Sequence, residues 1–146
     1  MWAMQVFISS AILAEIQQLV LDNAPQEICG ILLGRDGRVN SYRIARNVAA
    51  DPVRHFEIDP ATLIAAERAS RDGGDPILGY YHSHPAGTVD PSQTDAASAA
   101  ADGRIWLILN GRDAAAWQAV DGGKIYGRFD AITLDCPVAN GQTAAE

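Results

Sequence analysis

Residues 79–95 of this chain read GYYHSHPAGTVDPSQTD, and the rest of the sequence is organised around them. The apolar run from Ile77 to Tyr81 indicates a buried strand, and it leads directly into His82 and His84. Side chains alternate along a strand, so these two imidazoles point to the same side. Two imidazoles that lie close together on one face can bind one metal ion. The stretch therefore predicts half of a metal site at the end of a central strand.

The second half of the stretch supplies an oxygen ligand. A turn with a glycine and two prolines follows the histidines, and Ser92 then opens an alanine-rich helix. Asp95 lies one turn into this helix, so we expect its carboxylate to reach back toward His82 and His84. Two nitrogens and one oxygen would hold Zn²⁺ and leave a fourth position for water, as in catalytic rather than structural zinc sites.

Each part of this pattern also has an ordinary structural interpretation. A His-x-His pair on a strand is often two polar residues beside a turn. Ser92 is also a good helix N-cap, with Asp95 in the first turn as its capping-box partner. Taken alone, Ser92 is therefore open to both a capping and a catalytic interpretation. The combination is more specific than its parts because the histidines, the turn and the Ser-x-x-Asp are contiguous.

With its spacer, the sequence from His82 to Asp95 resembles the JAMM motif of the MPN family of zinc metalloproteases. That motif has His-x-His, ten residues and then Asp, with a Ser three residues before the Asp. A second family element, an upstream Glu before Cys-Gly and an apolar run, resembles EICGILLG at residues 27–34. The likeness covers roughly residues 5–130. It implies an α/β (α+β) fold in which a mixed, curved central sheet is flanked by helices in a single MPN-like domain.

The resemblance also implies an activity and a role for each motif residue. His82, His84 and Asp95 would hold one Zn²⁺, which lowers the pKa of its water from about 15.7 to about 7 and polarises a carbonyl. Glu27 would take the proton of that water and return it to the leaving amine. Ser92 would hydrogen-bond the developing oxyanion, and a hydroxyl at a helix N-terminus independently suits a negative charge.

The family hydrolyses bonds after the C-terminal Gly-Gly of ubiquitin and ubiquitin-like proteins. This chain resembles the compact prokaryotic members, which process sulfur-carrier or small ubiquitin-like proteins. The resemblance therefore implies a zinc-dependent peptidase or isopeptidase whose partner is the C-terminal tail of such a protein. RadC-like, DNA-associated proteins share the motif spacing, and zinc-free members act as scaffolds, so both remain as alternatives.

Composition narrows the classes of partner. With 146 residues, 48% hydrophobic and 20% charged, the chain is expected to form one globular domain. Its net charge of −7 argues against binding to nucleic acid, which requires a basic surface. Cys29 and Cys136 are too far apart to indicate a disulfide framework, and Cys29 is expected in the core. No apolar run is long enough for a membrane span, and no signal peptide is visible, so we expect a cytoplasmic protein.

Periodicity and turn signals predict the remaining elements. We expect helices at about 10–23, 60–71 and 92–101, and strands at 5–8, 28–33, 38–47, 54–58, 77–82, 105–109, 114–120 and 124–129. The domain is expected to span residues 1–134, and residues 135–146 are expected to form a flexible tail. The third histidine, His55, receives no role, because three protein ligands suffice for a catalytic zinc.

Overall fold

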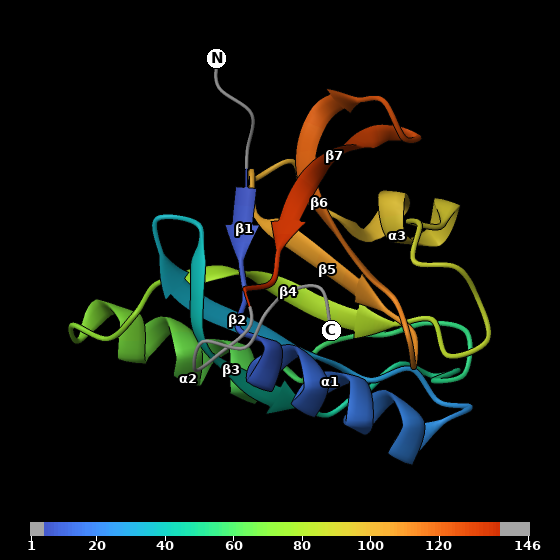
Figure 1. The fold of residues 1–146 in the computed structure, drawn as a ribbon, viewed down its shortest axis with the longest axis horizontal. Coiled ribbons are helices and arrows are strands. Elements are labelled where there is room, and N and C mark those ends of the chain that lie inside the picture. Colours follow the sequence, from blue (N-terminus) through green and yellow to red (C-terminus); the bar gives the residue numbers. More distant parts are fainter. Residues whose placement is uncertain (1–4, 138–146) are drawn as a thin grey trace.

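The structure is a computed structural model and describes residues 5–137. Its seven strands and three helices, in chain order (Figure 1), are β1 (Gln5–Phe7), α1 (Ser10–Asn23), β2 (Cys29–Arg35), β3 (Arg38–Ala45), α2 (Pro60–Arg71), β4 (Ile77–Ser83), α3 (Gln93–Ser98), β5 (Ile105–Leu109), β6 (Ala114–Gly123) and β7 (Gly127–Asp135).

All seven strands belong to one mixed sheet in the order β1-β3-β2-β4-β5-β6-β7. β4 and β5 run parallel, whereas β2 pairs antiparallel with both β3 and β4. β1 pairs with β7 through three residues and with β3 through one, so the sheet closes on itself as a barrel. The mixed sheet with flanking helices confirms the predicted fold class, and its closure through β1 is an additional feature.

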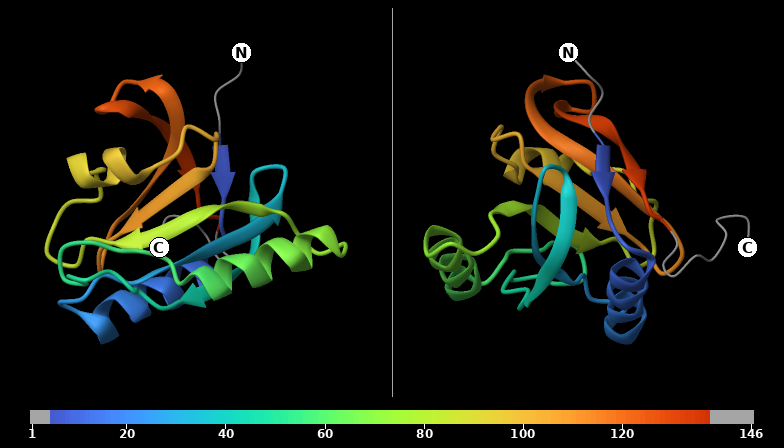
Figure 2. Two further views of the ribbon diagram at one scale, coloured as in Figure 1. Left: turned by 180° about the vertical axis from the view of Figure 1, so that it is seen from behind. Right: turned by 60° about the vertical axis from the view of Figure 1, so that its left-hand side comes forward.

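Helices α1 and α2 cover opposite faces of the central strands (Figure 2). Ile16 and Val20 of α1 pack with Leu32 of β2 in one core cluster. Ala66 of α2 packs with Ile31, the neighbouring residue of the same strand, in another. Because successive side chains of a strand point to opposite faces, this division explains why β2 is an unbroken apolar run.

Two predicted elements differ from the structure. The third helix was expected to reach residue 101 but ends at Ser98, because Ala99 takes extended backbone angles and packs into the cluster around Trp106. The last hairpin was expected to turn at residues 121–123, but β6 continues to Gly123 and the turn lies after it. Tyr126 and Gly127, both at positive φ, form this turn. The prediction that the last strand ends at residue 129 was therefore wrong, because β7 continues to Asp135 and pairs with β1.

The segment predicted as a strand at 54–58 is not one. Residues 51–54 form a turn, and within this segment only Ile58 makes an isolated bridge, to Asn47. Residues 138–146 of the predicted tail lie outside the described residues, and the domain limits stay a prediction. Within residues 5–137, no helix is both long and apolar enough to cross a membrane.

Candidate metal centre

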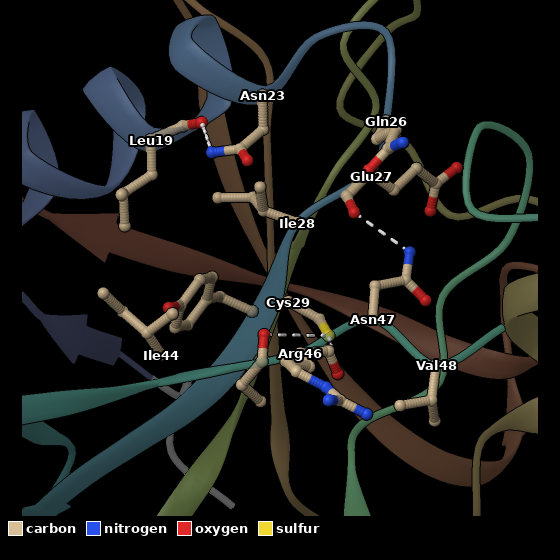
Figure 3. Close-up of a pocket in the computed structure, with 12 residues that line it drawn as sticks. Leu19, Asn23, Gln26, Glu27, Ile28, Cys29, Ile44, Arg46, Asn47 and Val48 are labelled. Carbon is tan, nitrogen blue, oxygen red and sulfur yellow. Dashed lines mark hydrogen bonds between the residues drawn. The ribbon is translucent and has the colours of Figure 1, made fainter.

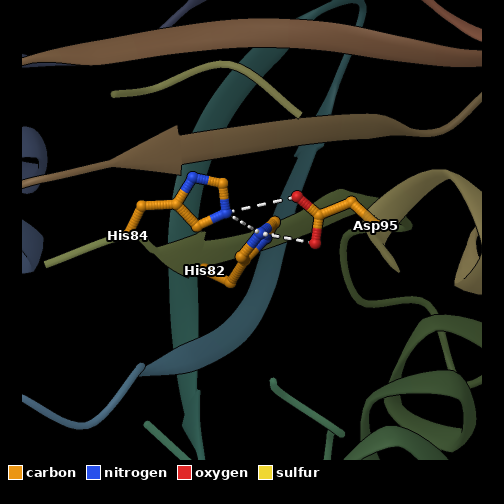
Figure 4. Close-up of side chains that lie close together, drawn as sticks. All are labelled: His82, His84 and Asp95. Atoms are coloured by element: carbon orange, nitrogen blue, oxygen red, sulfur yellow. Dashed lines mark hydrogen bonds and ion pairs between the residues drawn. The ribbon is translucent and has the colours of Figure 1, made fainter. Parts of the chain in front are cut away.

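The two motif histidines lie at the end of β4, at one end of the sheet. His82 is the penultimate residue of the strand and is completely buried, and His84 follows just beyond it with a side chain that is 16% exposed. The backbone N–H of His84 donates to the carbonyl of Leu109, which continues the pairing of β4 with β5. As the alternation predicts, both imidazoles point to the same side (Figure 4).

The short helix α3 holds the carboxylate. Ser92 is its N-cap: the Ser92 Oγ accepts from the backbone N–H of Asp95, and the Asp95 Oδ2 accepts from the backbone N–H of Ser92, each at 3.0 Å. This capping box satisfies backbone donors at the helix start and fixes the Asp95 rotamer. The capping interpretation of Ser92 is therefore correct, and because its Oγ acts as an acceptor in this box, the O–H of Ser92 can donate to another acceptor.

His82, His84 and Asp95 form one compact cluster (Figure 4). The Asp95 Oδ1 lies 3.2 Å from the His82 Nε2, and the Asp95 Oδ2 lies 3.2 Å from the His84 Nε2. The two Nε2 atoms are themselves 3.2 Å apart. Four ligand atoms of Zn²⁺ in tetrahedral geometry, at about 2.0–2.1 Å from the ion, would lie about 3.3–3.4 Å from one another. The spacing of the cluster thus allows one small cation to bind between the two imidazoles and the carboxylate.

The hydrogen bonds of His84 independently indicate that this cluster is stabilised by a cation, either a proton or a metal ion. The His84 Nδ1 lies 2.9 Å from the carbonyl oxygen of Thr88, which can only accept, so Nδ1 carries the proton. In neutral His84 the Nε2 then presents a lone pair to the Asp95 carboxylate, and two lone pairs at 3.2 Å repel each other. Either an added proton or a metal ion removes this repulsion, and the Thr88 contact is the kind of second interaction that orients metal-binding histidines.

The pKa values of the cluster follow from this arrangement. Burial opposes ionisation of Asp95, but hydrogen bonds from both imidazoles outweigh burial and hold the pKa of this carboxyl well below its usual range. Burial lowers the pKa of His82, whose ring is fully enclosed. Burial also acts to lower the pKa of His84, but its contacts with Asp95 and Thr88 prevail and raise it. The carboxylate is therefore ionised and His82 favours the neutral form, as metal ligands must.

Aromatic side chains enclose the buried imidazole. The ring of Phe56 stacks on His82 with a centroid distance of 4.1 Å and an interplanar angle of 17°. Trp106 meets the same imidazole edge-on at 5.4 Å. These rings fix the orientation of His82 and keep water from one side of the cluster.

Glu27 lies beside the cluster through the register of β2 and β4. Cys29 pairs with His82, and hydrogen bonds between Ile28 and Ser83 continue the pairing, so Glu27 lies opposite His84. Glu27 is only 8% exposed. Burial is the main cause that raises the pKa of Glu27 to about 7. The nearby His84 acts to lower this pKa, whereas the negative charge of Asp95 raises it further. A carboxyl group with this pKa can both accept and return a proton near neutral pH.

A cavity of about 610 Å³ opens next to Glu27, between the end of α1 and the segment that follows β3 (Figure 3). Leu19, Asn23, Ile44 and Val48 are among its lining residues, but none of the three clustered side chains is. Glu27 therefore borders this cavity and is also close to His84 and Asp95 of the cluster. Cys29 also borders the cavity and is buried as predicted, and burial raises the pKa of its thiol to about 12, so it remains an unreactive thiol.

Sequence reasoning named five site residues, and the structure places all of them at this end of the sheet. His55 is exposed and belongs to no cluster of possible ligands within residues 5–137. Phe56 and Thr88 were missed. Thr88 contributes only a backbone carbonyl, which any residue would supply, and the stacking of Phe56 depends on the path of an irregular segment. Neither residue leaves a signal in the sequence.

Comparison with known proteins is consistent with the geometry. The family model of prokaryotic homologues of the JAB domain matches residues 9–121, which include all five site residues. A desampylase from Haloferax volcanii is 36% identical over 102 residues, which cover 68% of this chain and 73% of the relative. A desampylase from Pyrococcus furiosus is 34% identical over 62% of this chain and 64% of its own length, just under two thirds. A CysO-cysteine peptidase from Mycobacterium tuberculosis is 29% identical over 61% of this chain and 62% of its own length.

Solved structures share the fold. A protein from Desulfitobacterium hafniense superposes with a TM-score of 0.78 at 24% identity, covering 94% of this chain and 96% of that protein. A JAB1/MPN domain protein from Archaeoglobus fulgidus superposes with a TM-score of 0.57 at 16% identity, covering 89% of this chain and 99% of that protein. The chain thus belongs to the prokaryotic homologues of the JAB domain and is an enzyme of the JAMM hydrolase type.

Proposed function

We propose that this chain is a zinc-dependent peptidase or isopeptidase that hydrolyses the bond after the C-terminal Gly-Gly of a ubiquitin-like or sulfur-carrier protein. The observation that carries the proposal is the enclosed cluster of His82, His84 and Asp95, with Glu27 beside it at a pKa of about 7. Two imidazoles and a carboxylate are a donor set that suits Zn²⁺.

Different residues of this chain bind the metal, transfer the proton and stabilise the oxyanion during hydrolysis. A zinc ion held by His82, His84 and Asp95 would supply a water molecule of lowered pKa and polarise the substrate carbonyl. Glu27 accepts the proton of the attacking water as the oxygen bonds to the carbonyl carbon. It then gives that proton to the nitrogen as the C–N bond breaks, so that an acid and an amine are released. Ser92 donates its free hydroxyl proton to the carbonyl oxygen as negative charge develops there.

The enclosure of the centre supports a glycine-rich substrate. His82 is completely buried, Asp95 is 5% exposed, and Phe56 and Trp106 cover one side of the buried imidazole. A chain segment without side chains fits such a site most easily, as Gly-Gly does. The relatives are named desampylase and CysO-cysteine peptidase, which supports a carrier-protein conjugate as the substrate class.

Intact-mass analysis of candidate carriers tests this function. Ubiquitin-like and sulfur-carrier proteins with a short C-terminal extension after Gly-Gly are incubated with the zinc-loaded protein, and carriers ending in Gly-Ala before the extension serve as controls. We expect loss of the extension directly after Gly-Gly, abolished by chelation and restored by zinc. Unchanged masses across the carriers would contradict the proposed substrate class, and cleavage that survives chelation would exclude a metal mechanism.

A further inference from the structure

The side chain of Asn47, just beyond β3, forms a dense set of hydrogen bonds next to Glu27. Its Nδ2 donates to the backbone carbonyls of Glu27 at 3.0 Å and of His55 at 2.9 Å (Figure 3 shows the first). Its Oδ1 accepts from the backbone N–H groups of Ala49 at 3.1 Å and Glu57 at 3.0 Å. A primary amide has two N–H groups and two oxygen lone pairs, so this side chain is fully used.

The backbone of Glu27 depends on contacts with the residues after β3, because Glu27 lies before the first residue of β2. β2 begins only at Cys29, so neighbouring strands do not hold the backbone of Glu27. Its carbonyl is bonded by Asn47, and its N–H donates to the carbonyl of Pro52 at 2.8 Å. Both backbone polar groups of Glu27 are therefore fixed by residues 47–57 (the β3–α2 segment). Asn47 is the residue of this segment that uses its side chain to do so.

The same segment also reaches the metal cluster. It carries Phe56, whose ring stacks on His82. Asn47 bonds the residues on both sides of Phe56, through the carbonyl of His55 and the N–H of Glu57. One amide thus links the backbone of Glu27 to the backbone on both sides of Phe56, whose ring stacks on His82.

We infer that Asn47 is a positioning residue that holds the Glu27 carboxylate at its working distance from the metal centre. The inference rests on the proposed function, because it assigns to Glu27 the role of proton carrier. It differs from a merely structural role, in which the amide only satisfies loop backbone groups. A structural role predicts a loss of stability, whereas a positioning role predicts a loss of turnover in folded, metal-loaded protein.

Two variants separate these roles, with a matched control. Asn47→Asp keeps the oxygen that accepts from Ala49 and Glu57 but removes the N–H groups that hold Glu27. Asn47→Ala removes both and introduces no charge, so agreement between the two variants excludes a charge effect. Asn40→Ala is the control, because Asn40 is an exposed residue of β3 whose side chain donates to the partly exposed carboxylate of Asp75.

We expect both Asn47 variants to bind zinc as the wild type does and to lose turnover roughly 10²-fold, since displacement of a catalytic group by about 1 Å has this effect. KM should change by less than about threefold, because a proton carrier acts in the transition state. Amide exchange, measured without substrate, should accelerate at Ala49 and Glu57 in Asn47→Ala and stay slow in Asn47→Asp. Asn40→Ala should match the wild type in all these measurements.

Combination with Glu27→Gln completes the experiment. If Asn47 acts through Glu27, adding Asn47→Ala or Asn47→Asp to Glu27→Gln changes the residual turnover no further. Wild-type turnover in the folded Asn47→Asp protein, or losses that multiply in the double variants, would overturn the inference. Full activity of Glu27→Gln alone would instead overturn the proposed role of Glu27, so the two failures are distinguishable.

Discussion

Glu27 combines burial with a place beside the metal cluster, and its amide variant isolates its proton chemistry. Glu27→Gln keeps the shape and the neighbouring contacts but cannot accept a proton. We expect turnover to fall by roughly 10²–10⁴, the usual contribution of a general acid–base group. Steady-state kinetics beside zinc analysis checks this, and near-normal hydrolysis by a zinc-loaded variant would remove Glu27 from the mechanism.

The same carboxyl makes the stability of the metal-free protein depend on pH. Its folded pKa of about 7 is higher than the ordinary glutamate value of 4.5, so between these values the folded state binds more protons than the unfolded state. Stability contributed by this group is therefore lost as pH rises from about 4.5 to about 7. Glu27→Gln should remove that loss and stabilise the apoprotein at pH 8 by about 1–3 kcal/mol relative to its effect at pH 4. Denaturant unfolding of both apoproteins measures the difference, and an equal effect at both pH values would contradict it.

Ser92 has a structural role, and its proposed catalytic role predicts a further effect. Loss of the cap in Ser92→Ala costs about 1 kcal/mol of stability. Loss of an oxyanion donor should lower turnover roughly 10²–10³-fold. Ser92→Asp preserves a cap but places a carboxylate near the developing charge, so it should be slower than Ser92→Ala. Steady-state kinetics and melting temperatures of both variants distinguish the two roles. A lowered melting temperature with unchanged turnover in Ser92→Ala would show that Ser92 only caps the helix.

How far the site can be read from sequence depends on how local its contacts are. His82, His84 and Asp95 fall within one strand–turn–helix segment, so alternation along the strand and the helix start already predict that they converge. Glu27 lies 55 positions before His82, and only the family resemblance linked it to the site. The role of Asn47 depends on an irregular segment, whose path no periodicity encodes.

Among the elements, long periodic or unbroken apolar segments were predicted well and their ends less well. The apolar run of β2 predicted only a buried strand, and the apolar spacing in α1 predicted only a helix. The alanine-rich run after Ser92 has high helix propensity throughout, but packing of Ala99 against the cluster around Trp106 ends α3 early. β7 alternates weakly and was missed beyond residue 129, because its pairing with β1 joins opposite ends of the chain.

The importance of β7 for the core leads to a prediction for Phe129. Its ring is completely buried and packs against Trp106 at 5.1 Å. Phe129→Ala should lower the free energy of unfolding by about 3–5 kcal/mol, through lost burial and the cavity left behind. Denaturant unfolding measures this effect, and the folded fraction should still bind zinc because no proposed ligand changes. A loss below about 1 kcal/mol would show that the barrel core does not depend on this ring.

At the scale of the whole molecule, the metal cluster borders the apolar core without being part of it, because Trp106 of the core meets the ring of His82 edge-on. Three apolar clusters, on both faces of the sheet and around Trp106, hold the described elements together. None of their buried members is one of the three proposed metal ligands. We therefore expect the fold to persist without metal, and the ligands to form a site that is filled after folding.

Zinc content per chain tests the central claim most directly. The protein is purified without chelating resin, and its zinc content is measured by inductively coupled plasma mass spectrometry. The variants His82→Ala and Asn40→Ala, the latter as the control, are measured in the same way. The account predicts one zinc per chain in the wild type and in the control, and none in His82→Ala. Chelation should remove the zinc from the wild type while far-ultraviolet circular dichroism stays unchanged. A wild-type protein without stoichiometric zinc, or a His82→Ala variant that retains it, would contradict the account.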